Sequence, residues 1–176
     1  MLRKFMPSVI DNSVGEGIEI CVAEQRLTLH RTPHDCQHYL ISTAKNGVGE
    51  RENSGCTPRG RHIIAQKIGA DAPINSVFVA RQPTGEIYDD ALAVAHPARD
   101  WILSRIMWLS GCEAGFNQGD GCDTYRRYIY IHGTPDTEPM GTPLSHGCIR
   151  MRNSDVIDLF AQISEGTPVQ IVETRD

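Results

Sequence analysis

The six residues 145–150, Ser-His-Gly-Cys-Ile-Arg, place a cysteine where its thiol can react. Gly147 comes directly before Cys148 and permits a backbone turn that a residue with a Cβ resists. Backbone N–H groups exposed in such a turn can hold the oxyanion that develops during acyl transfer. A small, buried Cys148 with a purely structural role is the alternative interpretation, because free cysteine is often buried.

A histidine upstream supplies a candidate base for this thiol. His132 ends the run Ile-Tyr-Ile-His at 129–132, whose alternation predicts a strand. A cysteine needs a nearby base or a positive field to form a thiolate, and an imidazole titrates in the useful range. Together with His146, which lies two positions before the thiol, His132 favours a nucleophilic Cys148 over a structural one.

Two separated motifs connect these residues to a known family. The segment 132–134 (His-Gly-Thr) and the later residues 145–150 resemble the active-site signature of the L,D-transpeptidase (YkuD-type) catalytic domain. Residues 42–44 (Ser-Thr-Ala) and 57–60 (Thr-Pro-Arg-Gly) resemble its ST…TPxG segment, and residues 18–29 its opening strands. The resemblance implies a cysteine enzyme that handles peptidoglycan stem peptides through a thioester, without a cofactor or a metal ion.

The resemblance also assigns three residues to catalysis. Cys148 is expected to attack the carbonyl of the L,D bond between the third stem residue and the terminal D-alanine, while His132 accepts the thiol proton. The backbone carbonyl of Gly133 is expected to orient the imidazole through its other nitrogen, as the third partner of a nucleophilic triad. D-alanine then leaves, and the thioester waits for an acceptor.

Further residues beside the thiol are expected to bind the oxyanion or the substrate. The backbone N–H groups of Gly147 and Cys148 would hold the oxyanion, and His146 would line the same site. Ser145 and Arg150 would support the site or hold a substrate carboxylate through charge-assisted hydrogen bonds.

The acceptor decides which reaction results. Water gives a trimmed tripeptide and L,D-carboxypeptidase activity, an amine of a neighbouring stem gives a 3–3 cross-link and L,D-transpeptidase activity, and a free D-amino acid gives exchange. We favour water, because a cytoplasmic enzyme would meet soluble muropeptides during murein recycling and not polymerised murein. The resemblance also implies that carbapenem-type β-lactams acylate Cys148.

The expected location rests on the first residues. Residues 1–8 contain a basic pair, but no apolar run follows, and Asp11, Asn12 and Glu16 interrupt the stretch where one would lie. No segment approaches the ~20 apolar residues of a membrane span. We therefore expect a cytoplasmic enzyme. A periplasmic or cell-envelope enzyme is the alternative if the chain is the mature form of an exported protein.

The composition is typical of a globular enzyme. The chain has 176 residues, of which 40% are hydrophobic and 22% are charged, as is ordinary for a single globular domain. We expect one catalytic domain over 1–176, with its core at about 18–172. A net charge of −5 gives no electrostatic reason to expect nucleic acid as a partner.

Short alternating or β-branched runs predict a mainly β fold. The expected strands are a pair over 18–29 and single strands at 38–43, 62–68, 76–80, 127–131 and 169–172. Residues 102–109 suit a short helix or a strand, and their length favours a strand. Turn-forming residues predict a turn at 82–85, a loop over 45–60 and a glycine-rich loop at 111–123 that is a candidate lid over the site.

One late helix is expected beside the reactive segment. Ser154 is a good N-cap, and one apolar face follows it, formed by Val156, Leu159, Phe160 and Ile163. Gly166 then ends the helix. The elements together predict an L,D-transpeptidase-like β-sandwich or barrel with one late helix beside the active-site loop.

Zinc binding and simple adhesion are the competing interpretations. One candidate zinc site alternates along a single segment, His34, Cys36 and His38, but that segment is expected in a loop and no fourth ligand is evident. The other would use the reactive residues themselves, His132, His146 and Cys148, as a metallohydrolase or a structural zinc module. A catalytically silent peptidoglycan-binding module is the alternative to an enzyme.

The six cysteines of the chain are expected to be free thiols. A chain of this length with a good core has little need of disulfides, and the nucleophile itself must stay unpaired. If one disulfide forms, Cys112 and Cys122 are the most plausible pair, because they share a loop.

Overall fold

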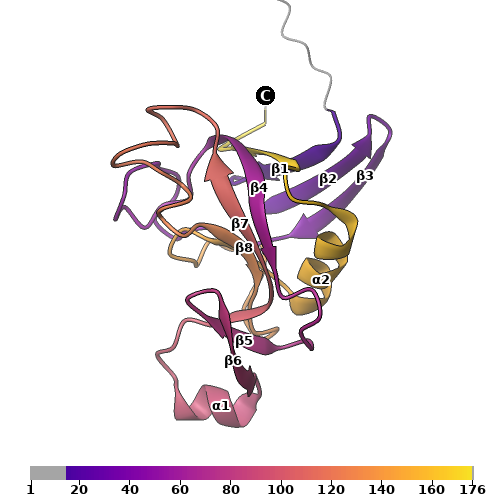
Figure 1. Ribbon diagram of the computed structural model, residues 1–176, viewed down its shortest axis with the longest axis vertical. Helices are drawn as coiled ribbons and strands as arrows, with labels where there is room; N and C mark the ends of the chain where they lie inside the picture. The colour runs from indigo at the N-terminus through magenta and orange to yellow at the C-terminus, as the bar shows by residue number, and fades with distance from the viewer. Residues whose placement is uncertain (1–14, 176) are drawn as a thin grey trace, which may run out of the picture.

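The computed structural model describes residues 15–175, which form one curved sheet of ten strands with two helices (Figure 1). The strands in chain order are β1 (Gly17–Cys21), β2 (Arg26–Thr32), β3 (Asp35–Leu40), β4 (Gly60–Ile68), β5 (Ser76–Val79), β6 (Gln82–Ile87), β7 (Ile102–Gly111), β8 (Tyr130–Gly133), β9 (Ile149–Met151) and β10 (Pro168–Val172). The helices are α1 (Asp90–Ala95) and α2 (Asn153–Gln162). The strand order is β3-β2-β1-β10-β4-β7-β5-β6, and β8 joins β7 to β9. The prediction of a mainly β fold with one late helix beside the reactive segment is confirmed.

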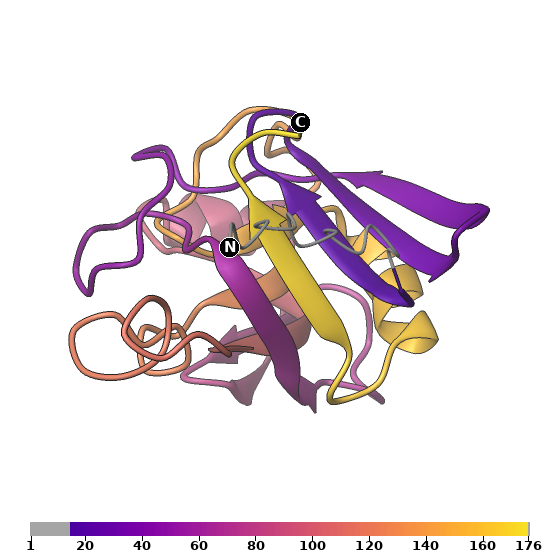
Figure 2. The ribbon, with the colours of Figure 1, turned by 90° about the horizontal axis from the view of Figure 1, so that it is seen from above.

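An aliphatic core forms on one side of this sheet because alternate residues of a strand point the same way. β1 and β10 pair in parallel, and the opposed Ile20 and Ile171 are both almost fully buried. Figure 2 shows the yellow β10 lying between the indigo β1 and the purple β4. α2 adds Val156, Leu159 and Phe160 to the same core, as its apolar face predicts.

β7 connects the main sheet to a smaller lobe. It pairs with β4 over most of its length and with β5 near its beginning, so that the β5–β6 hairpin and α1 extend away from the main sheet (Figure 1). The register with β8 shifts between Leu103 and Ile106, where Ser104 has a left-handed φ of 68°. The prediction of a strand at 102–109 is confirmed and the strand is slightly longer.

The prediction of a turn at 82–85 is wrong. The chain turns instead at Ala80 and Arg81, which both have left-handed φ angles of 47° and 66°, the conformation of a two-residue hairpin. Residues 82–87 form β6, which lies at the end of the strand order. An edge strand tolerates Pro83, because the missing N–H is not needed for a further neighbour.

The strand predicted at 127–131 begins later than expected, at Tyr130. The backbone N–H of Arg127 bonds to the carbonyl of Asp123, and Tyr128 adopts a left-handed φ of 56°, so these residues form a turn. The predicted strand at 38–43 is also displaced, because β3 already begins at Asp35 and pairs with β2. The expectation of a loop over 34–38 is therefore wrong for residues 35–38, whereas His34 lies in the turn between β2 and β3.

The helix cap differs from the prediction. α2 begins at Asn153, its cap position is Arg152, and no side chain caps it through a hydrogen bond, so Ser154 is not the N-cap. The fully buried Asn153 instead binds the Thr134 carbonyl through its side-chain amide. The short α1 was not predicted. No helix within residues 15–175 has the length and apolar character needed to cross a membrane.

Candidate active site

The pairing of β8 with β9 puts the candidate nucleophile and base on one face of the sheet. The strands run in parallel, with Ile131 opposite Ile149 and His132 opposite Arg150. Opposed residues of adjacent strands point to the same side, and neighbours along a strand to opposite sides. Ile131 and Ile149 therefore enter the aliphatic core, and His132 shares the other face with Arg150 and, two positions back, with Cys148.

The Cys148 thiol lies in a hydrogen-bonded, apolar setting. Its Sγ accepts a hydrogen bond from the Tyr130 backbone N–H at 3.3 Å and donates to the Tyr128 carbonyl at 3.4 Å. The side chain packs against a cluster of mostly aromatic residues, Phe78, Ile106, Trp108 and Tyr130, which we call the aromatic cluster. Burial raises the pKa of the Cys148 thiol to about 12. The resting group is therefore a neutral thiol.

His132 is held in one orientation by its neighbour. The ring is 2% exposed, and its Nδ1 lies 2.7 Å from the backbone carbonyl of Gly133. Since a carbonyl only accepts, Nδ1 carries the proton and Nε2 has a free lone pair. Burial lowers the pKa of His132. The ring is thus a neutral imidazole whose Nε2 can accept a proton, and Gly133 occupies the orienting position expected of it.

Close packing explains why position 133 is a glycine. A Cβ there would lie 2.5 Å from the Leu103 carbonyl oxygen and 2.6 Å from the side-chain oxygen of Asn153. Both distances are too short for a real contact, so a larger residue would push β8 away from β7. Gly133 therefore fixes the position of the carbonyl that orients His132.

His132 and Cys148 share one face of the sheet, but they are not hydrogen-bonded to each other. Among the hydrogen bonds of residues 15–175, none links His132 to Cys148, because the thiol donates to the Tyr128 carbonyl instead. A rotation of the thiol away from Tyr128 would be needed before a proton could pass to the imidazole. Apo geometry of this kind is common in enzymes that tighten only when the substrate binds.

The turn before the thiol is built by a buried serine. The hydroxyl of Ser145 donates to the Cys148 carbonyl at 2.5 Å and accepts from the Gly147 N–H at 3.2 Å. The hydroxyl of Thr57 donates to the Gly147 carbonyl at 2.9 Å. Gly147 has a left-handed φ of 134°, and a Cβ there would lie 3.0 Å from Cδ1 of Ile129. Ser145 therefore supports the turn, and the oxyanion role of Gly147 stays a prediction.

A carboxylate that the sequence did not indicate joins Arg150 and His146. Asp100 accepts from Nη2 of Arg150 at 3.0 Å and lies 3.9 Å from Nδ1 of His146. The Arg150 side chain is only 11% exposed, whereas that of His146 is 66% exposed. Arg150 is therefore already paired with a protein carboxylate. Asp100 follows no recognisable motif, and only the folded chain brings it here.

The sequence analysis also missed a half-buried arginine, Arg127. Arg127 donates to the backbone carbonyls of Gly49, Glu50 and Cys56, the last at 2.7 Å. Burial lowers its pKa. Arg127 thus ties the loop over 45–60 to the turn that precedes β8.

The candidate lid, the loop 111–123, is anchored to the beginning of β4. The fully buried Asn117 donates its side-chain amide to the carbonyls of Arg59 and Arg61 at 3.0 and 3.1 Å. The six cysteines are all unpaired, Cys112 and Cys122 of this loop included.

Neither of the two residue sets considered for zinc forms a metal site in the described part of the chain. Cys36 and His38 share one face of β3, with Sγ 3.7 Å from Nε2, while Nδ1 of His38 lies 2.9 Å from the Thr28 hydroxyl. Within residues 15–175, no cluster of three or more His, Cys, Asp or Glu side chains is arranged to hold a metal ion.

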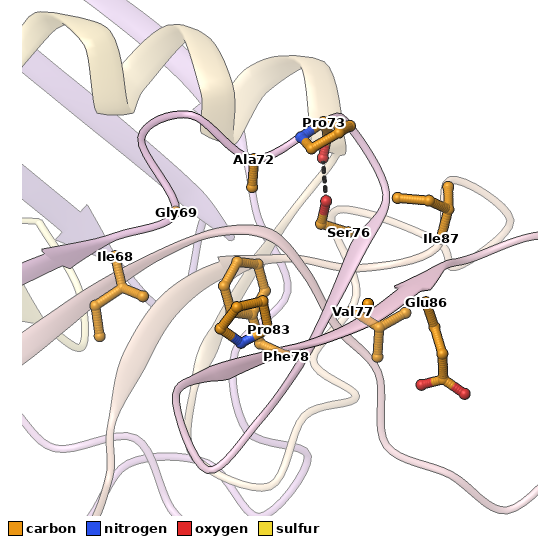
Figure 3. A pocket seen from close by; sticks show the side chains of 11 residues that line it. Ile68, Gly69, Ala72, Pro73, Ser76, Val77, Phe78, Pro83, Glu86 and Ile87 are labelled. Carbon is orange, nitrogen blue, oxygen red and sulfur yellow. Dashed lines mark hydrogen bonds between the residues drawn. The ribbon is translucent and has the colours of Figure 1, made fainter.

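A cavity of about 480 Å³ lies between the β5–β6 hairpin and the segment after β4. Figure 3 shows Ile68, Phe78, Val77 and Pro83 around it. Phe78 also belongs to the aromatic cluster, so the cavity and the cluster share this side chain.

The comparisons with known proteins agree with this arrangement. Residues 15–171 match the family described as YkuD: L,D-transpeptidase catalytic domain. The chain is 43% identical over 177 residues to the probable L,D-transpeptidase YbiS of Escherichia coli (strain K12), covering 94% of this chain and 47% of that relative. It is 45% identical over 170 residues, with the same coverage, to the probable L,D-transpeptidase ErfK/SrfK of Salmonella typhimurium (strain LT2). The chain spans about half the length of these curated relatives.

Solved structures share the fold. Bd1075 of Bdellovibrio bacteriovorus is similar with a TM-score of 0.57 at 15% identity, covering 91% of this chain and 48% of that chain. The L,D-transpeptidase LdtMt1 in complex with imipenem is similar with a TM-score of 0.53 at 17% identity, covering 88% and 57%. With a family match over most of its length and relatives above 40% identity, this chain belongs to the L,D-transpeptidase (YkuD-type) catalytic domain family, as its motifs predicted.

Proposed function

We propose that this enzyme cleaves the L,D bond between the third residue and the terminal D-alanine of peptidoglycan tetrapeptide stems through a thioester on Cys148. The observation that carries the proposal is the pairing of β8 with β9, which puts Cys148 and a carbonyl-oriented His132 on one face. Family membership supplies the substrate class. The neutral thiol and the neutral imidazole are the protonation states from which attack must begin.

The first half of the reaction forms the thioester. As Sγ attacks the carbonyl carbon, its proton passes to Nε2 of His132, and the C–N bond to D-alanine breaks once His132 has returned that proton to the leaving nitrogen. The N–H groups of Gly147 and Cys148 are proposed to hold the oxyanion, which requires the Gly147 N–H to leave the Ser145 hydroxyl. The products are the tripeptidyl thioester and free D-alanine.

We propose water as the acceptor in the second half. His132 takes a proton from water, the resulting hydroxide attacks the thioester carbonyl, and the thiolate leaves and regains its proton from His132. The product is a tripeptide with a new carboxylate. We propose soluble muropeptides, as they arise in murein recycling, as the substrates of this L,D-carboxypeptidase activity.

Transpeptidation is the second candidate, favoured by the names of the relatives. Both YbiS and ErfK/SrfK are named probable L,D-transpeptidases, and each is similar over 94% of this chain. An amine of a second stem would then attack the same thioester. Thioester formation is common to both candidates, so only the products distinguish them.

The test is product analysis. Pure protein is incubated with a soluble disaccharide tetrapeptide, with and without a second stem as amine acceptor, and the products are followed by mass spectrometry beside Cys148→Ala. Loss of one D-alanine without dimers, absent in the variant, is the expected result. Dimers as the main product would replace water by an amine as the acceptor. Equal turnover by Cys148→Ala would overturn the thioester mechanism.

Carbapenem-type β-lactams provide a second probe of the same thiol. The solved relative LdtMt1 is described in complex with imipenem. We propose that Cys148 opens the β-lactam ring of such compounds and keeps the acyl group, adding the full mass of the inhibitor. Intact-protein mass spectrometry should show one adduct on the wild-type protein and none on Cys148→Ala.

A further inference from the structure

The tip of the β5–β6 hairpin carries an arginine toward the aromatic cluster. The left-handed backbone at Ala80 and Arg81 makes a tight two-residue turn. The guanidinium of Arg81 lies 4.8 Å from the ring centre of Trp108 and 4.7 Å from that of Tyr128. Its Nη1 donates to the Tyr130 hydroxyl at 3.0 Å. Three aromatic residues thus hold a cation that comes from the turn between β5 and β6.

The same three aromatic residues also adjoin the reactive thiol. The Tyr130 N–H donates to Sγ of Cys148, and Sγ donates to the Tyr128 carbonyl. Cys148 also packs against the aromatic cluster, to which Trp108 belongs. Arg81 therefore contacts residues that contact the nucleophile.

Arg81 keeps most of its hydrogen-bonding capacity free. A guanidinium has five N–H donors, and within residues 15–175 the bond to Tyr130 is the one hydrogen bond that Arg81 makes. No carboxylate of that range forms an ion pair with it. The aromatic contacts hold the cation in place without neutralising it.

The other arginines near the site already bind groups of the protein. Arg150 is paired with Asp100 at 3.0 Å. Arg127 donates to three backbone carbonyls, and the 8%-exposed Arg105 donates to the carbonyls of Ala72 and Ser104. Of these four arginines, Arg81 is the one whose guanidinium keeps free donors for an anion of the substrate, and it is linked to Cys148 through Tyr128 and Tyr130.

We propose that Arg81 binds the terminal carboxylate of the departing D-alanine and makes the enzyme selective for stems that end in a free carboxylate. This inference rests on the proposed function and adds a specificity-determining residue to it. The leaving D-alanine carries its carboxylate one carbon from the scissile nitrogen, so its anchor must lie beside the nucleophile. Arginine suits this role, because its planar fork binds a carboxylate through two parallel hydrogen bonds.

The test compares a tetrapeptide stem that ends in free D-alanine with the same stem ending in D-alaninamide. kcat/KM for D-alanine or D-alaninamide release is measured for wild type, Arg81→Gln, Arg81→Lys and the control Arg99→Gln. Arg99 is matched because it also stacks on a tryptophan, Trp101, at 4.6 Å and pairs with Glu86. Arg81→Gln should lower kcat/KM about 10- to 100-fold for the free acid and less than about 3-fold for the amide. Arg81→Lys should recover part of the loss, and Arg99→Gln should keep the wild-type ratio.

An equal loss for acid and amide in Arg81→Gln would overturn the inference, because a merely structural role affects both substrates alike. If wild type releases nothing from either stem, the proposed function fails, and Arg81 is then judged by binding. The affinities of Cys148→Ala for the two stems are measured by calorimetry, with and without Arg81→Gln. A preference for the acid that disappears with Arg81→Gln supports the inference, and one that is absent or unchanged overturns it.

Discussion

The aliphatic core and the aromatic cluster lie on the two faces of β7 and β8, and they differ in composition and in exposure. The aliphatic core, between the sheet and α2, contains residues such as Ile131, Ile149 and Leu159 that are fully buried. The partly exposed Cys148 packs against the aromatic cluster, and Tyr128, which is 52% exposed, lies beside Trp108 of that cluster. One face therefore stabilises the fold, and the other keeps a reactive group within reach of a substrate.

The largest expected effect on the aromatic side comes from the base. His132→Gln should lower kcat about 100- to 10,000-fold, because the thiol proton has no acceptor during attack. The control is His38→Gln on β3, an exposed strand far along the sheet order from β8. Rates are measured as D-alanine release from a soluble tetrapeptide. A His132→Gln variant that keeps more than about a tenth of the wild-type kcat would contradict the role of this histidine.

One truncation in the aliphatic core and one beside the aromatic cluster test the difference between the two faces. Leu159→Ala should lower the free energy of unfolding by about 2–5 kcal/mol, since a fully buried leucine leaves a cavity. The half-exposed Tyr128→Ala should cost less than about 1 kcal/mol but should lower kcat/KM, because it removes one ring that holds Arg81. Urea denaturation and turnover are measured on both. Equal effects of the two variants on stability would remove the distinction between the two faces.

A substitution in the turn before Cys148 should have a smaller effect on stability. Gly147→Ala should cost about 1–3 kcal/mol in free energy of unfolding and also lower turnover, since its Cβ would approach Ile129 and the Cys56 carbonyl. Gly166→Ala is the matched control, because Gly166 has a left-handed φ of 88° with no atom near its Cβ position. The difference between the variants in urea denaturation measures the close approach. Identical losses would show that backbone strain alone matters at Gly147.

The pH dependence of Cys148 is the most delicate test. The folded pKa of about 12 lies above the ordinary thiol value of about 8.5, so the native state keeps its proton where the unfolded state has lost it. The difference in free energy of unfolding between wild type and Cys148→Ala should therefore be the same at pH 7 as at lower pH. As the pH rises from about 9 toward 12, wild type should lose stability relative to the variant. Thiolate absorbance of wild type minus Cys148→Ala checks the titration. A midpoint below about 8 would contradict the neutral resting thiol.

The sequence predicted those parts that depend on local pattern. The alternation at residues 18–29 and the apolar face from Val156 to Ile163 appear as strands and as a helix, because burial of one face requires that periodicity. The motif around Cys148 could be found because the turn there needs a glycine. Family membership followed from the same motif.

The residues that the sequence missed depend on long-range packing. Asp100 reaches Arg150 and His146 only because β7 and β9 both lie next to β8. The Ala80–Arg81 turn has no glycine or asparagine to mark it, so the turn was placed at 82–85. Asn153 was taken to lie outside the helix, yet it is buried against Thr134 at the first helical position. Tertiary contacts decide each of these positions, and a single sequence does not record them.

The most direct test of the central claim is to trap the thioester. Wild type and Cys148→Ala are mixed with a soluble tetrapeptide stem, quenched in acid within milliseconds to seconds, and weighed as intact proteins by mass spectrometry. A covalent adduct equal to the stem minus D-alanine, present on wild type, located by peptide mapping at Cys148 and absent from the variant, is the predicted result. D-alanine release by wild type with no adduct at any time, or an adduct that persists in Cys148→Ala, would contradict the account.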